Sequence, residues 1–274
     1  MAEIEVVEGI AGLEPRLGRL LVAVGVFDGL HRGHAYLLRR LVEEAAAIGA
    51  RPTVLTFDAH PDAVVRGEAP PLLLDPEERL VRLARAGVEV VVVVHFDDAL
   101  RHTPYAAFVE SIAQRVELAG FVMTPDAAFG YERRGTPDAL AGLAARRGGG
   151  AAFRVIVVAP YLLDGRPVRS GDIRAAVAAG RLDDARRLLG RRHAVTGAPD
   201  GHGVFRTAMP VALPPVGRYV ASATAPWSLD LATPSGRSRR LEVAVEAIGA
   251  VVERDVAAAL AGHRLRLAFV EHAR

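Results

Sequence analysis

The stretch that decides the fold is GVFDGLHRGH, residues 25–34, which joins the apolar run LLVAVGVF (20–27) to a long amphipathic segment starting at His34. An apolar run of this length, a glycine-rich turn and a helical pattern together predict a strand, a turn and a helix. In open α/β sheets such a turn presents backbone N–H groups and the positive end of the helix dipole at the carboxyl edge, where anions bind. The stretch therefore predicts a parallel sheet with an anion site at this turn.

Two histidines flank the turn at positions i and i+3, so both imidazoles of His31 and His34 can face one bound anion. Gly33 between them lets the backbone approach a ligand closely. These residue types indicate phosphoryl or nucleotidyl transfer in which no side chain acts as a nucleophile. A pair of surface histidines beside an incidental glycine is the alternative, because short motifs recur by chance. The strand-turn-helix context favours the functional interpretation.

Apolar runs alternate with helical patterns up to about residue 160, as in a parallel sheet covered by helices. Thr103-Pro104 and Thr136-Pro137 each predict the N-cap and first residue of a helix. Glycines follow the ends of several helical patterns, where left-handed backbone closes a helix. The predicted strands are 20–27, 51–57, 88–95, 121–123 and 153–158, and the predicted helices include 34–48 and 76–86.

Beyond residue 159 the pattern changes. Two short helices are predicted over 172–179 and 182–189. The segments GRYVASA, LEVAVEA and HRLRLAFVEH then alternate apolar and polar residues, which predicts a small antiparallel β domain. We expect the domain boundary near Arg191.

Composition limits the chemistry and the partners. The 274 residues carry a formal net charge of +2 with both signs interspersed, so we expect no nucleic-acid surface. No apolar run is long enough to span a membrane and the N-terminus has no signal-peptide pattern, so we expect a cytoplasmic protein without a membrane partner. Cysteine is absent, which excludes disulfides and thiolate zinc sites. Lysine is absent too, so arginine, histidine, hydroxyl or backbone groups, or a metal, must hold phosphate. The sequence does not give the oligomeric state.

Four motifs, in order along the chain, resemble those of the bacterial FAD synthetases, which are bifunctional riboflavin kinases and FMN adenylyltransferases of the HxGH nucleotidyltransferase superfamily. GVFDGLHRGH resembles the family's GxFDGxHxGH, and TFDAHP (56–61) resembles TFxPHP. FVMTPDAAFGYERRGTPDAL (121–140) resembles VVGxDFxFGxxRxGxxxxL. RSGDIRAAVAAGRLDDARRLLGR (169–191) resembles SSTxIRxxLxxGxVxxAxxLLGR.

The resemblance implies a Rossmann-like nucleotidyltransferase domain over residues 1–190 that transfers AMP from ATP to FMN, with Mg²⁺ as cofactor and FAD and pyrophosphate as products. ATP and FMN, or a related flavin, are then the small-molecule partners. The site residues it implies are His31, His34 and Arg174 for catalysis, Gly25, Phe27, Asp28, Gly29, Gly33 and Ser170 for ATP, and His60, Pro61, Asp126 and Phe129 for the flavin.

The chain departs from the family pattern mainly on the acceptor side. Ala59 replaces a proline, and Ala127-Ala128 replaces a Phe-Arg pair, which removes a flat surface and a positive charge from one wall of the flavin site. Arg169 and Gly171 replace a serine and a threonine in the second phosphate motif. Two alternatives therefore stay open, namely another flavin-like or small phosphorylated acceptor, and a non-catalytic nucleotide- or flavin-binding protein.

Residues 191–274 resemble a degenerate, shortened riboflavin kinase domain, for which we expect an antiparallel β-barrel-like fold. The family's GRxLGFPTAN stretch corresponds best to GVFRTAMPVALP (203–214), with Val211 and Leu213 where threonine and asparagine would organise Mg-ATP. Aliphatic side chains cannot ligate a hard cation. Glu242 aligns with the kinase's general base. We therefore expect that riboflavin kinase activity is lost.

Overall fold

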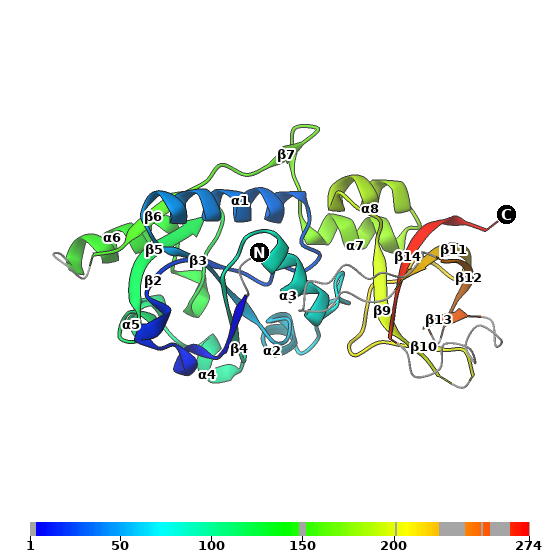
Figure 1. Cartoon of the computed structure of the whole chain (residues 1–274), viewed down its shortest axis with the longest axis horizontal. Coiled ribbons are helices and arrows are strands. Elements are labelled where there is room, and N and C mark those ends of the chain that lie inside the picture. The colour runs from blue at the N-terminus through cyan, green and yellow to red at the C-terminus, as the bar shows by residue number, and fades with distance from the viewer. Residues whose placement is uncertain are drawn as a thin grey trace. The chain divides into compact units, whose positions relative to one another are not determined.

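The computed structural model describes residues 4–147, 152–200, 202–224, 239–247, 249–252 and 264–273. The chain divides into two compact units, and Figure 1 labels their helices and strands. The boundary between residues 190 and 191 stays a prediction. The first unit comprises Met1–Phe27, Gly33–Pro70 and Arg82–Leu162, and the second comprises Asp28–Arg32, Pro71–Val81 and Leu163–Arg274.

A six-stranded sheet with the order β1-β4-β3-β2-β5-β6 forms the centre of the first unit, and every neighbouring pair in it is parallel. This confirms the predicted α/β class. The strands are rich in valine, leucine and isoleucine because helices bury both faces of a parallel sheet. Their bounds are β1 Glu5–Glu8, β2 Arg19–Val24, β3 Arg51–Phe57, β4 Val90–Val94, β5 Glu117–Met123 and β6 Arg154–Val157.

Helices cover both faces of this sheet. On one face, Phe108 and Ile112 of α5 and Leu140 of α6 join the inward side chains of β2 and β5 in one core cluster. On the other face α1 runs along the sheet, opposite α5 (Figure 1), and buries Leu38 and Leu41. The helices are α1 Arg32–Ala47, α2 Asp62–Arg66, α3 Pro76–Arg85, α4 Asp98–Arg101, α5 Tyr105–Ala113 and α6 Pro137–Arg147, with short 3₁₀ turns at Ile10–Gly12, Pro15–Leu17 and Tyr131–Arg133.

Two local predictions need correction. The strand predicted over 20–27 ends at Val24, because Phe27 adopts a left-handed conformation with φ of 52° that no strand accommodates. Thr103 is not the N-cap of α5, since Pro104 holds that position and the Thr103 hydroxyl donates to the Ala99 carbonyl of the preceding short helix. The other threonine-proline pair is as predicted, because the Thr136 Oγ1 atom accepts from the N–H of Ala139 in the first turn of α6.

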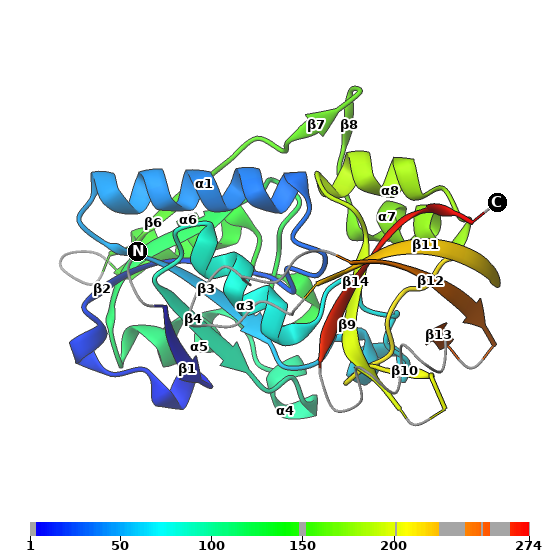
Figure 2. The ribbon, with the colours of Figure 1, turned by 45° about the vertical axis from the view of Figure 1, so that its right-hand side comes forward.

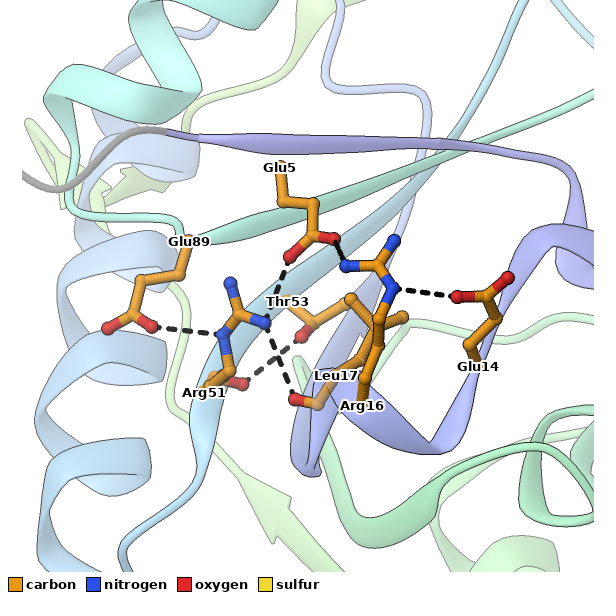
Figure 3. A network of polar contacts seen from close by, with 7 residues as sticks. All are labelled: Glu5, Glu14, Arg16, Leu17, Arg51, Thr53 and Glu89. Atoms are coloured by element: carbon orange, nitrogen blue, oxygen red, sulfur yellow. Dashed lines mark hydrogen bonds and ion pairs between the residues drawn. The ribbon is translucent and has the colours of Figure 1, made fainter.

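An ion-pair network closes the amino edge of the sheet (Figure 3). Arg51, at the start of β3, donates to Glu5 of β1 at 3.1 Å and to Glu89, just before β4, at 3.2 Å. Arg16 bridges Glu5 and Glu14. The network ties the starts of three strands together, and because it lies at the amino edge it is remote from the carboxyl edge, where open α/β sheets bind ligands.

The second unit contains a six-stranded antiparallel sheet with the order β10-β9-β14-β11-β12-β13, which curves into a barrel (Figure 2). An antiparallel bridge between Val204 and Val251 links its two ends. Tyr219 and Phe269 are fully buried in its core. The predicted antiparallel β domain is thereby confirmed. Its strands are β9 Ala194–Pro199, β10 Phe205–Arg206, β11 Gly217–Thr224, β12 Arg239–Glu246, β13 Gly249–Val252 and β14 Leu265–His272.

The two predicted short helices are present as α7 Ser170–Ala178 and α8 Leu182–Leu189, and they group with the barrel. A small hairpin, β7 Leu162–Leu163 and β8 Arg166–Pro167, precedes them. In the part of the chain that the structure describes, no helix is both long and apolar enough to cross a bilayer.

Candidate functional site

Three segments leave neighbouring strands at the carboxyl edge of the parallel sheet. Strand β2 lies between β3 and β5, so the turn after β2 is flanked by the segments after β3 and β5. The N–H of Gly25 donates to the carbonyl of Leu55 at 3.0 Å, and the Thr56 hydroxyl donates to the carbonyl of Val26 at 3.1 Å. These bonds fix the start of the turn beside β3. The three segments are those that carry the predicted ATP and flavin residues of the first unit.

The turn itself has unusual backbone. Phe27, Gly29 and Leu30 all have positive φ, at 52°, 79° and 36°. The φ of Gly29 favours glycine, and a Cβ added there would also make a tight contact, 3.0 Å from the side chain of Leu73. Positive φ at the two non-glycine residues stores strain that the surroundings must hold in place.

His31 comes directly before α1, and Gly33 and His34 lie in the first turn of that helix. The first N–H groups of a helix have no partner within it, so this turn presents donors to an anion. The His34 ring packs against the ring of Phe27, with centroids 5.2 Å apart. The sequence prediction that both histidines flank a strand-turn-helix junction is therefore correct in its local structure.

The electrostatics of His31 distinguish it from a surface histidine. Its residue is 5% exposed. Burial, and then the positive charge of Arg191, lower the pKa of His31 from 6.5 to about 4. The ring is therefore neutral near pH 7 and offers one N–H donor and one acceptor nitrogen.

Asp28 anchors the turn rather than facing solvent. It is 3% exposed, and its two carboxylate oxygens accept from the N–H of Leu73 at 3.0 and 3.1 Å. Nη2 of Arg174 donates to the same carboxylate at 2.7 Å. A buried carboxylate with these partners stabilises the fold of the turn, and removing a partner would leave a buried charge.

The structure brings the two predicted residues of the second phosphate motif to this turn. Ser170, the first residue of α7, donates from its hydroxyl to the carbonyl of Asp28 at 2.9 Å. Arg174 lies one helical turn later and also donates from Nε to the carbonyl of Pro71 at 2.9 Å. Ser170 and Arg174 follow Asp28 by 142 and 146 positions in the sequence, and the fold nevertheless brings all three into one cluster. That Ser170 and Arg174 also contact phosphate stays a prediction.

Sequence reasoning missed one residue of this cluster. Arg191 donates from Nη2 to the carbonyl of Gly29 at 2.5 Å and from Nη1 to the carbonyl of Leu30 at 3.1 Å. Its sequence signal is its place as the last residue of the fourth motif, at the predicted domain boundary. Ser170 and Arg191 together therefore donate hydrogen bonds to three consecutive carbonyls of the turn, those of residues 28–30.

The predicted flavin residues lie in the segments after β3 and β5. His60 Nδ1 accepts from the N–H of Asp62 at 3.2 Å, and Pro61 is the N-cap of α2. Asp126 is exposed and accepts from the Thr124 hydroxyl at 2.7 Å. The ring of Phe129 packs at 5.2 Å on Phe108 and at 5.4 Å on Phe121, which places it against the core. Flavin contact by these residues stays a prediction.

Among the described residues no group of three or more histidine and carboxylate side chains could hold a metal ion. Asp28, the acidic residue of the turn, is engaged by Leu73 and Arg174. The described side chains therefore do not form a preformed magnesium cage.

Comparison with known proteins gives a family and a fold. A family model described as FAD synthetase matches residues 14–172. A bifunctional riboflavin kinase/FMN adenylyltransferase from Pseudomonas fluorescens is 31% identical over 194 residues, covering 70% of this chain and 61% of the relative. A protein of the same name from Listeria monocytogenes is 31% identical over 183 residues, covering 65% of this chain and 55% of the relative. The matched segments thus span less than two thirds of these relatives.

One solved structure is similar over the whole chain. It is described as "Crystal Structure of Macrolide-efflux Protein from Streptococcus pneumoniae", and it aligns with a TM-score of 0.79 at 20% identity, covering 100% of this chain and 91% of the other. At this identity the likeness establishes a shared fold and carries no statement about activity.

Proposed function

The chain belongs to the FAD synthetase family, and on that premise we propose that it transfers AMP from ATP to FMN, with FAD and pyrophosphate as products. The observation that supports this most is the turn over 28–34, in which Asp28 and His31 are buried, Ser170 donates to the backbone carbonyl of Asp28 and Arg174 donates to its carboxylate. Such a turn at the carboxyl edge of a parallel sheet suits the binding of phosphates.

In the proposed reaction an oxygen of the FMN phosphate attacks the α-phosphorus of ATP, and the bond from that phosphorus to pyrophosphate breaks. Negative charge builds up on the transferred group and on the leaving pyrophosphate. The amide groups at the start of α1, with His31 and His34, would donate hydrogen bonds to those oxygens. A neutral His31 contributes one hydrogen-bond donor, and its pKa of about 4 makes its other ring nitrogen a weak base. Positioning and charge stabilisation supply the acceleration.

Mg²⁺ belongs to the proposal through its usual chemistry of neutralising phosphate charge. Because the described side chains form no metal cluster, the ion would arrive bound to ATP, with phosphate oxygens and water as most of its ligands. No step of the proposed reaction depends on a protein ligand to the metal.

We propose further that the barrel has lost riboflavin kinase activity. Val211 and Leu213, which replace the residues that would organise Mg-ATP, pack against the apolar core of the barrel and line a cavity of about 570 Å³. Hard cations require oxygen ligands, which these side chains lack. Glu242, in the position of the general base, pairs with Arg218 at 2.7 Å. A general base can accept a proton, but phosphate transfer also needs a site that holds the metal-bound nucleotide beside it.

A different acceptor is the second candidate. Ala127 packs against the core of the first unit, and neither Ala127 nor Ala128 offers the ring or the guanidinium that the family pattern places there. Without that guanidinium, this side of the proposed acceptor site favours acceptors that carry less negative charge, or acceptors whose phosphate binds to other residues.

Pyrophosphate release separates these functions. The full-length protein is incubated with Mg-ATP and, in separate reactions, with FMN, riboflavin, other phosphorylated small molecules or no acceptor. We expect release with FMN and formation of FAD. Release with another acceptor alone would favour the second candidate, and no release with any acceptor would leave a binding protein.

Two controls sharpen the assay. His34→Ala should slow release by at least about 100-fold, whereas His202→Ala, which alters an exposed histidine outside the proposed site, should leave it unchanged. Formation of FMN from riboflavin and ATP would contradict the loss of kinase activity.

A further inference from the structure

Arg191 is placed differently from Arg174, the arginine that the sequence assigned to the site. Its two terminal nitrogens donate to the carbonyls of Gly29 and Leu30, at 2.5 and 3.1 Å. The hydroxyl of Ser170 holds the preceding carbonyl, that of Asp28, at 2.9 Å. The three residues immediately before His31 are therefore held through their backbone.

These hydrogen bonds hold a backbone conformation that is otherwise unfavourable. Leu30 has a φ of 36°, and Phe27 a φ of 52°, which non-glycine residues adopt only where the surroundings enforce them. A planar guanidinium with two parallel N–H donors can hold two neighbouring carbonyls in one fixed orientation. An ammonium group is a single point of attachment and lacks this geometry.

Arg191 also sets the charge environment of the turn. Its guanidinium is close enough to His31 to oppose a second positive charge on the imidazole, in addition to the effect of burial, and so helps to lower the pKa of that ring. The buried turn therefore keeps a neutral ring beside a fixed cation.

We infer that Arg191 is a positioning residue for the turn over 28–31, and that it acts on nucleotide transfer by fixing the backbone before His31 rather than by touching substrate. The kinetic part of this inference rests on the proposed function, whereas the structural part does not.

The structural test needs no turnover. The imidazole signals of the full-length protein are followed by NMR as a function of pH, with His31 assigned from the loss of its signal in His31→Gln. In Arg191→Leu we expect the pKa of His31 to rise above about 4 but to stay below 6.5, because burial still lowers it while the neighbouring cation is gone. Arg192→Leu, which removes the adjacent exposed arginine, should leave it unchanged. An unchanged His31 titration in folded Arg191→Leu would overturn the inference.

The kinetic test distinguishes positioning from substrate binding. Arg191→Lys keeps a positive charge and is the variant best placed to fold, but it cannot hold both carbonyls. We expect kcat to fall by about 100-fold, as for a misplaced catalytic group, with KM for ATP little changed. A normal kcat with a raised KM would show that Arg191 binds ATP directly and would refute positioning. If the parent protein transfers no AMP at all, the proposed function fails, and the titration of His31 still decides the role of Arg191.

Discussion

The free energy of unfolding should fall as the pH drops from 6.5 towards 4, because His193 must stay uncharged in the folded protein. His193 is 2% exposed, and its ring stacks on Phe269 with the planes 8° apart. Nε2 lies 2.7 Å from the carbonyl of Ala212, so Nε2 carries the proton and donates. Among the described residues Nδ1 has no hydrogen-bond partner, so a second proton there would be buried without an acceptor.

The sign and size of the effect follow from the pKa. Burial lowers the pKa of His193 from 6.5 to about 4; the hydrogen bond to Ala212 and the charge of Glu78 oppose this, whereas Arg191 and Arg266 add to it. Between these two pH values the unfolded chain binds a proton that the folded chain does not, so acidification favours unfolding. The stabilisation is complete above pH 6.5. At 1.36 kcal/mol per unit, the loss by pH 4 is about 3 kcal/mol.

Denaturant unfolding measured from about pH 7.5 down to about pH 4.5 tests this against His193→Leu, which fills the site with an apolar side chain that cannot titrate. Carboxylates and His31 titrate in both proteins, so the difference between the two curves isolates His193. At neutral pH the variant should be less stable by about 1 kcal/mol for the lost hydrogen bond. Between neutral pH and about pH 4.5, the difference in the free energy of unfolding should shift by about 2–3 kcal/mol in favour of the variant. Parallel curves over this range would refute the reasoning, and His202→Leu is the matched surface control.

Further outcomes are expected at the site. His31→Gln and His34→Gln should each lower kcat for pyrophosphate release by about 10²–10³-fold, the cost of one transition-state donor, and an unchanged rate for both would remove them from the reaction. Asp28→Ala should lower the free energy of unfolding by about 3 kcal/mol, because the buried N–H of Leu73 and the partly buried guanidinium of Arg174 lose their acceptor; a loss below about 1 kcal/mol in urea unfolding would show that the pair is effectively solvated. Gly130→Ala should destabilise by at least about 2 kcal/mol, since its Cβ would lie 2.6 Å from backbone atoms at a φ of +76°. Gly67→Ala, with a φ of +79° but nothing within 4 Å, measures the cost of conformation alone, and an equal change in Tm for both would exclude the steric explanation.

Much of the fold could be predicted because its strands and helices follow from the spacing of apolar residues over short stretches of sequence. The apolar runs that became β3 and β4 and the helical pattern that became α1 need only neighbouring residues to be recognised. The prediction failed where tertiary contacts override local pattern. Val26 and Phe27 are apolar and read as strand, but the turn requires left-handed backbone at Phe27, so β2 ends earlier. Thr103 was predicted as a cap, but its hydroxyl bonds to the preceding helix instead.

The sequence by itself determined the strand-turn-helix junction, the two histidines around it and the parallel sheet that presents them, because each follows from spacing within a few residues. Only the tertiary structure decided how the turn is held. Arg174 meets Asp28 across 146 residues, and Arg191 meets Gly29 across 162. The pattern of neighbouring residues does not predict such partners. They depend on which arginine the complete fold places next to the carbonyls of the turn and the buried carboxylate, groups that need hydrogen-bond donors.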